Sequence, residues 1–277
     1  MESSKLLNTV YFIILIILSA VFIFPVFIVL INSFKLKFSI ADTPFVLPNT
    51  DTFTGLENYT TGIENTGFIS AFGWSLFITV FSVAAIVIFT SMTAWYIVRV
   101  KTIFTNVLYY ALVFSMIVPF QMVMFTMSKT ANTIGLDNPL GIILIYTGFG
   151  AGLSVFMFSG FIKSVPLGIE EAATIDGCNS LQVFWRVVFP ILKPTSITVA
   201  ILNTMWIWND YLLPYLVIGN DYKTIPVAIQ YLKGGYGSVD MGAMMAMLVL
   251  SIIPVIIFYL FSQKYIIKGV AAGAVKG

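Results

Sequence analysis

Six long apolar runs, separated by polar segments, dominate the pattern of the chain. They cover residues 10–31, 71–98, 107–127, 140–162, 195–218 and 241–261. Each has at least the roughly 20 residues that cross a hydrocarbon core as a helix. The first run follows Lys5 as a secretory signal would, but it is too long and continues past Pro25, so we expect an uncleaved first span. The pattern predicts an all-α membrane protein with six transmembrane helices.

Glycine, proline and polar residues indicate how these spans are joined. Residues 32–70 are polar and rich in turn formers, which predicts a loop outside the membrane with room for a short helix. Pro119 and Gln121 predict a kink in the third span. Glycines that suit close helix approach in lipid recur in the fourth span. They are Gly141, Gly148, Gly150, Gly152 and Gly160.

The polar stretch of residues 163–194, between the fourth and fifth spans, predicts two short helices around a glycine. We expect Ser164 to cap the first helix, with Pro166 near its first position. Gly177 supplies the left-handed residue that ends this helix, and Asn179 or Ser180 caps the second. The second helix has an apolar stripe followed by two prolines that stop it. These residues are Val183, Phe184, Val187, Val188, Pro190 and Pro194.

Composition narrows the possible chemistry. Hydrophobic residues make up 59% of the chain and charged residues 9%, with a mean hydropathy of +0.98. The chain has no histidine and a single cysteine, Cys178, which excludes a His/Cys metal cluster, a histidine-based catalytic triad and an internal disulfide. It also lacks a Gly-Lys dipeptide and therefore a phosphate-binding loop of the GxxxxGK[ST] type. We expect neither an ATPase nor another enzyme, and no catalytic residue or metal site.

Basic residues set the orientation of the six spans. With the N-terminus inside, nine basic residues are inside: Lys5, Arg99, Lys101, Lys163, Arg186, Lys193, Lys264, Lys268 and Lys276. Five are outside: Lys35, Lys37, Lys129, Lys223 and Lys233. This excess predicts that both termini and the 163–194 hairpin are cytoplasmic, and that the 32–70 loop is extracellular.

Ionisable residues are nearly absent from the spans, and Asp210 is the clear exception. One interpretation is an interfacial carboxylate beside the aromatic residues Trp206, Trp208 and Tyr211. The other is that Asp210, with Asn209, lines a polar translocation path. The scarcity of charge within the spans argues against an ion-coupled secondary transporter, which needs ionisable sites near the midplane.

The hairpin carries a recognisable motif. Glu171-Ala-Ala-Thr-Ile-Asp-Gly177, followed after nine residues by Val187-Val-Phe-Pro190, resembles the EAA motif of binding-protein-dependent ABC importer permeases. Nearly the whole chain is similar to the MalG-type carbohydrate permeases. The matching features are Leu56-Glu-Asn-Tyr59, Trp208-Asn-Asp-Tyr-Leu-Leu-Pro214, Ile253-Pro254 and the terminal Gly273-Ala-Val-Lys-Gly277.

The resemblance implies a type I ABC importer permease fold with a cytoplasmic EAA coupling hairpin. Residues 1–277 would form a single permease domain, which includes the extracellular loop 32–70, the hairpin 163–194 and a cytoplasmic tail, 262–277. The implied partners are a homologous second permease subunit, two cytoplasmic ABC ATPase subunits and an extracellular sugar-binding protein. ATP and Mg would be bound by the ATPase, with no cofactor in this chain and no nucleic-acid partner. The implied location is the bacterial cell membrane.

The resemblance also assigns roles to residues. ATPase coupling would fall to Glu170, Glu171, Ala172, Ala173, Asp176, Gly177, Phe184 and Pro190. The tail residues Gly273, Val275, Lys276 and Gly277 would insert near the ATPase dimer interface. The implied function is half of the translocation pore of an ATP-driven sugar importer, with oligosaccharides as the expected class. The alternatives are an ATP-independent secondary transporter and a membrane subunit that docks an ATPase without transporting.

Overall fold

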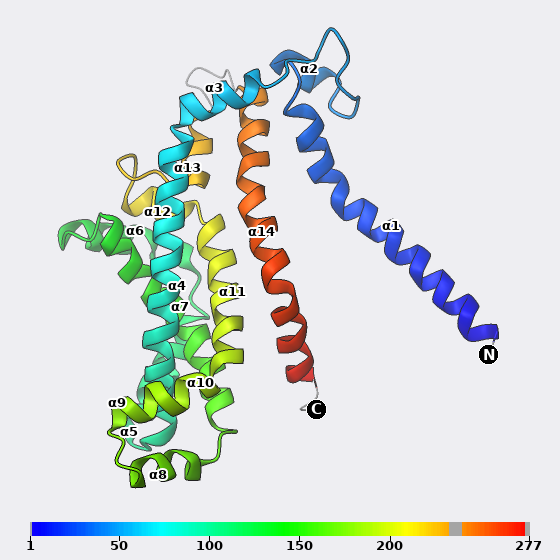
Figure 1. Ribbon diagram of the computed structural model, residues 1–277. Coiled ribbons are helices and arrows are strands. Elements are labelled where there is room, and N and C mark those ends of the chain that lie inside the picture. The colour runs from blue at the N-terminus through cyan, green and yellow to red at the C-terminus, as the bar shows by residue number, and fades with distance from the viewer. Residues whose placement is uncertain (1, 233–239, 275–277) are drawn as a thin grey trace. The chain divides into compact units, whose positions relative to one another are not determined.

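The computed structural model describes residues 2–232 and 240–274, and the side chains of these residues except 2–4, 6 and 266–274. This part of the chain is helical and contains no strand, which confirms the all-α fold (Figure 1). The elements are α1 (Glu2–Asn32), α2 (Lys37–Asp42), α3 (Glu57–Thr66), α4 (Phe68–Arg99), α5 (Ile103–Ser115), α6 (Phe120–Thr133), α7 (Pro139–Ile162), α8 (Leu167–Ile175), α9 (Ser180–Val183), the π-helix η1 (Phe184–Val188), α10 (Phe189–Ile191), α11 (Lys193–Asn209), α12 (Leu212–Val217), α13 (Ile225–Gln230) and α14 (Met241–Ala274).

Four helices in the described chain are long and apolar enough to cross a membrane alone. Their spanning parts are Leu7–Asn32, Phe68–Arg99, Pro139–Ile162 and Met241–Tyr265. Two bent pairs, α5 with α6 and the Ser180–Ile191 run with α11, bring the total to six when each pair counts as one span. The chain is therefore a multi-pass membrane protein. The six predicted spans agree with the upper count in number, but that count pairs α11 with Ser180–Ile191, which the sequence analysis assigned to the hairpin.

The third span is broken where the sequence predicted only a kink. Helix α5 ends at Ser115, α6 begins at Phe120, and the two helices are bent by 107°. Pro119 explains the break because it lacks an N–H for the helical ladder and pushes the preceding residue out of the α region. The helix axis therefore turns sharply at Pro119 instead of continuing through residues 107–127.

The fifth span is also shorter than the apolar run that predicted it. Helix α11 ends at Asn209, and Asp210 is extended with ψ 124°. Helix α12 then starts at Leu212. A continuous helix would press the ring of Pro214 against the carbonyl of residue 210, and the Asp210 side chain offers the freed N–H groups another partner. The prediction of one helix over residues 195–218 is therefore wrong beyond Asn209.

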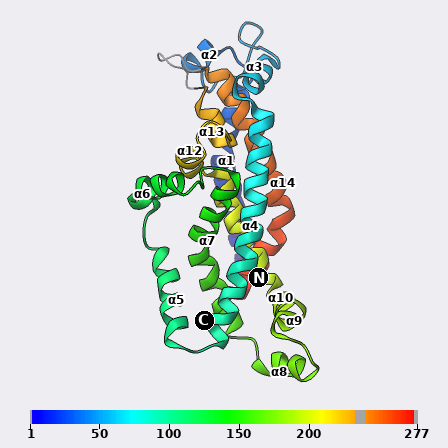
Figure 2. The same ribbon diagram turned by 90° about the vertical axis from the view of Figure 1, so that its left-hand side faces the viewer.

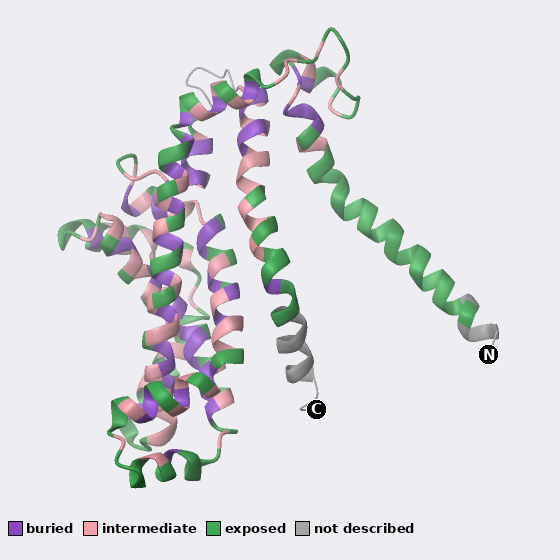
Figure 3. Ribbon diagram, in the orientation of Figure 1, coloured by how far each residue is buried: buried purple, intermediate pink, exposed green. Residues whose placement is uncertain are grey.

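The chain divides into two compact units, and the first comprises Met1–Ile69 and Ala228–Val255. Within it, the predicted extramembrane loop holds α2 and α3. The buried side chain of Asn58 donates from Nδ2 to the carbonyls of Ser33 (2.9 Å) and Lys35 (2.8 Å). Burial lowers the pKa of the Lys35 ammonium, which donates to the carbonyl of Thr43 at 2.7 Å. By contrast, the described side chains of α1 from Leu7 to Phe27 are exposed, as lipid-facing side chains would be (Figure 3).

The second unit, Ser70–Val227 with Ile256–Gly277, holds the main apolar core. Helices α4, α7 and α11 approach one another closely at Gly150 of α7. A Cβ placed there would lie 2.6 Å from Ile86 Cδ1 of α4 and 2.9 Å from Asn203 Oδ1 of α11. A Cβ at Gly152 would lie 2.6 Å from the carbonyl oxygen of Leu112 in α5, whereas a Cβ at Gly148 or Gly160 would meet open space. The expectation of close approach through glycine thus holds for some positions of the fourth span and fails for others.

Candidate functional site

The hairpin between α7 and α11 lies at one end of the second unit, beyond the C-terminal end of α4 (Figures 1 and 2). Its first helix, α8, starts at Leu167, and Pro166 occupies the capping position without a side-chain hydrogen bond. The predicted cap, Ser164, belongs instead to the turn that ends α7, where its Oγ donates to the carbonyl of Phe161 at 2.7 Å. The prediction for Ser164 was wrong, because α8 begins only at Leu167 and its cap position is Pro166, two residues after Ser164.

The turn between the two helices has the predicted glycine. Gly177 has φ +87°, in the left-handed region. Its N–H donates to the carbonyl of Thr174 at 3.0 Å, and the N–H of Cys178 donates to the carbonyl of Ala173 at 3.0 Å. These two bonds form a Schellman motif, in which the left-handed residue lets the chain reverse while the last carbonyls stay paired. The prediction that Gly177 ends the first helix is confirmed.

The second arm begins at a reciprocal cap. Asn179 accepts from the backbone N–H of Gln182, and the Gln182 side chain accepts from the backbone N–H of Asn179, both at 2.9 Å. Asn179, rather than Ser180, is therefore the cap. The arm continues as a π-helix, Phe184–Val188, that the sequence did not predict, and it changes direction by 76° at Leu192. It joins the core of the second unit through its buried stripe, Val183, Phe184 and Val188.

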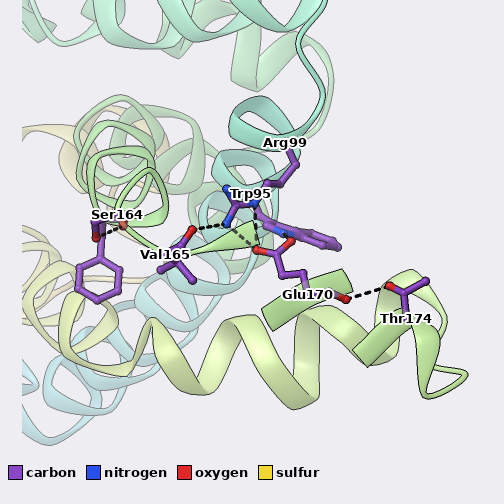
Figure 4. Close-up of polar contacts among 7 residues, drawn as sticks. Trp95, Arg99, Ser164, Val165, Glu170 and Thr174 are labelled. Atoms are coloured by element: carbon purple, nitrogen blue, oxygen red, sulfur yellow. Dashed lines mark hydrogen bonds and ion pairs between the residues drawn. The ribbon is translucent and has the colours of Figure 1, made fainter. Parts of the chain in front are cut away.

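The inner side of α8 is held by one carboxylate, that of Glu170 (Figure 4). Its Oε1 accepts from Arg99 Nε (2.9 Å) and Nη2 (2.7 Å), and its Oε2 accepts from Trp95 Nε1 (2.9 Å). Arg99 Nη2 also donates to the carbonyl of Val165 at 3.0 Å. The side chains of Arg99 and Glu170 are 18% and 8% exposed, so this is a largely buried ion pair with both carboxylate oxygens satisfied.

The outer side of α8 remains open. Glu171, Ala172 and Asp176 are exposed, and Ile175 is 86% exposed, while Ala173 is half-buried against the core. Glu171 and Ala172 lie four and three residues before Ile175, so both neighbour it on the same side of the helix, which we call the outer face. It combines a carboxylate, a small side chain and an exposed isoleucine.

Two of the predicted coupling residues do not reach that face. Glu170 is 6% exposed and turned toward α4, and Phe184 is fully buried, with its ring 5.6 Å from that of Trp95. Pro190 is exposed at the start of α10. Glu170 and Phe184 are therefore not available for direct contact with a partner, and their role in ATPase coupling stays a prediction.

Most of the predicted tail contact falls outside the described residues. Val275, Lys276 and Gly277 lie outside the described residues. Gly273 lies in the last turn of α14. The segment 262–277 therefore begins as a continuation of the last helix. Its proposed contact with an ATPase stays a prediction.

Asp210 bridges two elements of the second unit. Its Oδ2 accepts from the hydroxyl of Tyr146 at 3.0 Å, and its Oδ1 accepts from the backbone N–H groups of Leu212 (3.0 Å) and Leu213 (3.4 Å). The carboxylate thus caps α12 and ties the break after α11 to α7. Asn209 is exposed, and its Nδ2 donates to the carbonyl of Met205 at 2.7 Å. A role of Asn209 and Asp210 in a translocation path stays a prediction.

We expect Asp210→Ala to destabilise the protein and Asp210→Asn to leave it almost unchanged. Alanine removes a helix cap, about 1 kcal/mol, and leaves a buried tyrosine hydroxyl unpaired, about 1–3 kcal/mol. Asparagine keeps an oxygen for the cap and an amide beside Tyr146. The thermal unfolding midpoint of the detergent-purified protein measures both. Equal midpoints for wild type and Asp210→Ala would contradict the capping role.

The comparisons with known proteins decide the family. Residues 86–272 match the sequence profile of the binding-protein-dependent transport system inner membrane component. The chain belongs to this family. The matched segment runs from the middle of α4 to the last turn of α14 and contains the whole hairpin. The predicted membership of the ABC importer permeases is therefore confirmed.

Several relatives of this permease are named as sugar permeases. It is 40% identical to the probable starch degradation products transport system permease protein AmyC of Thermoanaerobacterium thermosulfurigenes, with 94% of each chain covered. It is 34% identical to the multiple sugar-binding transport system permease protein MsmG of Streptococcus mutans, and 32% identical to the melibiose/raffinose/stachyose import permease protein MelC of Bacillus subtilis, with 91% of each chain covered in both comparisons.

A solved structure supports the fold of the permease. The crystal structure of a bacterial ABC transporter involved in the import of the acidic polysaccharide alginate contains a chain that superposes with a TM-score of 0.76. The match covers 96% of this chain and 98% of that one, at 23% identity. The ABC importer permease fold is therefore shared along nearly the full length.

The sequence did not identify the inner contacts of the hairpin. Trp95 and Arg99 are four residues apart near the end of a span, which places them on one side of α4. That spacing was the available signal. Arg99 was interpreted only as a charge that fixes the orientation of the span, because its partner is 71 residues further along the chain.

Proposed function

We propose that this permease forms half of the translocation pore of an ATP-driven sugar importer and couples to a cytoplasmic ATPase through the α8 hairpin. The observation that carries the proposal is the two-sided structure of α8. Its inner side is fixed to α4 through Glu170, whereas Glu171, Ala172 and Ile175 are exposed on its outer face. An isoleucine that is 86% exposed on a short helix outside the candidate membrane spans is the kind of residue that a partner protein buries.

The composition of the outer face suits a docking contact. Ala172 leaves room for a partner surface to approach the helix backbone, and Glu171 offers an acceptor to a basic group on the partner. Ile175 adds apolar area at the centre of the contact. The absence of a phosphate-binding loop in the sequence means that the energy of ATP would come from this partner.

The assembly that we propose contains a second permease subunit, two ATPase subunits and an extracellular binding protein, with both termini of this chain in the cytoplasm. The basic residues assigned to the inner side support this orientation. An alginate ABC transporter, to which this chain is similar at a TM-score of 0.64, has been crystallised with an alginate pentasaccharide-bound periplasmic protein. That complex supports delivery of sugar by a separate protein here as well.

The substrate that we propose is an oligosaccharide. Relatives that are 40% and 32% identical are named for starch degradation products and for melibiose, raffinose and stachyose. The near absence of charge from the spans agrees with a neutral cargo. The sugar contacts themselves are not assigned to residues of this chain.

The test is sugar uptake by proteoliposomes that contain the complete complex. Radiolabelled malto-oligosaccharides and raffinose serve as probes, with the binding protein outside and ATP inside. We expect accumulation that requires internal ATP and survives a protonophore. Uptake that continues without ATP but stops with the protonophore would favour a secondary transporter. ATPase binding without uptake of any probe would contradict the transport role.

A further inference from the structure

Three N–H donors from one turn of α4 hold the carboxylate of Glu170 on α8. Arg99 supplies two of them to Oε1, at 2.9 and 2.7 Å, and Trp95 supplies the third to Oε2, at 2.9 Å (Figure 4). We call Trp95, Arg99 and Glu170 the clamp. A planar guanidinium that binds with two nitrogens fixes direction as well as distance, which a single point charge does not.

The clamp also fixes the segment that leads into α8. The same Arg99 nitrogen that binds Glu170 donates to the carbonyl of Val165 at 3.0 Å. Residues 163–166 are otherwise the short link between α7 and α8. The end of α4 therefore contacts α8 both at its approach and at its fourth residue.

Trp95 extends the clamp to the second arm of the hairpin. Its indole N–H binds Glu170, while its ring lies 5.6 Å from the buried ring of Phe184 in η1. Trp95 and Arg99 share one face of α4 because they are four residues apart. One turn of α4 thus touches both arms of the hairpin.

Apart from the clamp, the hairpin is joined to the spans by its chain connections to α7 and α11, and its second arm packs on the core through Val183, Phe184 and Val188. The clamp adds the polar connection of α8 to α4, a helix of 32 residues that is long and apolar enough to cross the membrane. It is mostly buried, so water does not compete strongly for it. None of its polar side chains belongs to the exposed outer face of α8.

We propose that the clamp makes the α8 hairpin and α4 move as one body, so that displacement of the hairpin by the ATPase is passed to the membrane spans through α4. This proposal rests on the proposed function. Arg99, Glu170 and Trp95 are positioning residues in it. They set how much transport each ATP hydrolysis produces, whereas the outer face sets whether the ATPase binds.

The experiment compares Arg99→Gln, Glu170→Gln and the double variant in proteoliposomes that hold the complete complex. ATP hydrolysis and uptake of radiolabelled malto-oligosaccharides are measured in the same vesicles. We expect each single variant to keep its ATPase and its hydrolysis, and to lose roughly tenfold in sugar imported per ATP, a typical size for loss of coupling. The double variant should lose no more than one single variant, because both remove the same contact.

Two further variants sharpen the readout. Arg99→Lys keeps the charge but not the two-nitrogen contact, so its ratio of sugar to ATP should lie between those of wild type and Arg99→Gln. Lys101→Gln removes the positive charge of an exposed side chain two residues after Arg99. This variant should keep the wild-type ratio of sugar to ATP. If Arg99→Gln, Glu170→Gln, the double variant and Arg99→Lys all failed to assemble, the contact would only hold the fold, and the proposal would be overturned.

The remaining outcomes separate this proposal from the proposed function. A wild-type ratio in the single variants, a parallel loss of hydrolysis and uptake, or losses that multiply in the double variant would each overturn the clamp. In all three cases, ATP-driven uptake by wild type would leave the proposed function standing. Failure of wild type itself to import sugar with ATP would reject the proposed function first.

Discussion

Gly177→Val is expected to reduce ATP-driven sugar uptake to near background while the permease still inserts into the membrane. Gly177 has φ +87°, a conformation that costs a residue with a Cβ about 1–2 kcal/mol, and more for a β-branched side chain. A Cβ at this position would meet no atom within 4 Å, so crowding is not the cause. The strain falls on the Schellman turn that sets the direction of α8 relative to α9.

Two variants test whether backbone conformation is the reason. Gly177→Asn should retain most of the uptake, because asparagine tolerates the left-handed region better than other residues with a side chain. Gly160→Ala adds a Cβ in open space on α7 and should behave as wild type. Uptake is measured in vesicles with matched amounts of inserted permease. Wild-type uptake by Gly177→Val would show that the turn has no part in coupling.

Glu171→Lys should release the ATPase from the permease and thereby abolish uptake. Glu171 is exposed on the outer face of α8, beside Ala172 and within one turn of Ile175. A lysine there would face the basic group that we expect on the ATPase, and like charges in a desolvated contact cost several kcal/mol. The amount of ATPase that copurifies with a tagged permease measures the effect directly.

A matched charge reversal controls for expression and insertion. Glu64→Lys, at an exposed position of α3, makes the same chemical change in the first compact unit, which does not contain the hairpin, and should keep its full complement of ATPase. If Glu171→Lys retains as much ATPase as Glu64→Lys and imports sugar at the wild-type rate, the outer face is not the docking surface.

The sequence predicted features that depend on local chemistry. Long apolar runs located the helices, because each run must satisfy its own backbone in lipid. The left-handed turn at Gly177 followed from a residue type that has few other solutions, and the cap of the second helix was narrowed to Asn179 or Ser180, of which the structure selects Asn179. The family followed from the spacing of the hairpin motif. Each of these signals lies within a few residues of the structure that it specifies.

Features that depend on distant partners were not predictable from the sequence. Glu170 and Glu171 are adjacent carboxylates, and nothing local tells which one faces α4. The apolar residues of α8 do not form a clear stripe, so periodicity could not orient the helix. The choice is made by Arg99 and Trp95, more than 70 residues earlier in the chain.

The breaks in two spans illustrate a second limit. Pro119 signalled a kink, but neither the 107° bend between α5 and α6 nor the contact of α6 with α12 could be read from the sequence. From the sequence, Asp210 was interpreted as either an interfacial residue or a residue of the translocation path. In the structure it makes two contacts that composition does not reveal. It caps α12 and accepts from the buried hydroxyl of Tyr146. Hydropathy counts apolar residues and is insensitive to such contacts.

The most direct test of the coupling hairpin is a cryo-electron microscopy structure of the complete complex with its ATPase bound. We expect the outer face of α8, with Glu171, Ala172 and Ile175, to be buried in a surface of the ATPase. Glu170 should remain paired with Arg99 in the same structure. An ATPase seated elsewhere on the permease, with Ile175 still exposed, would contradict the account.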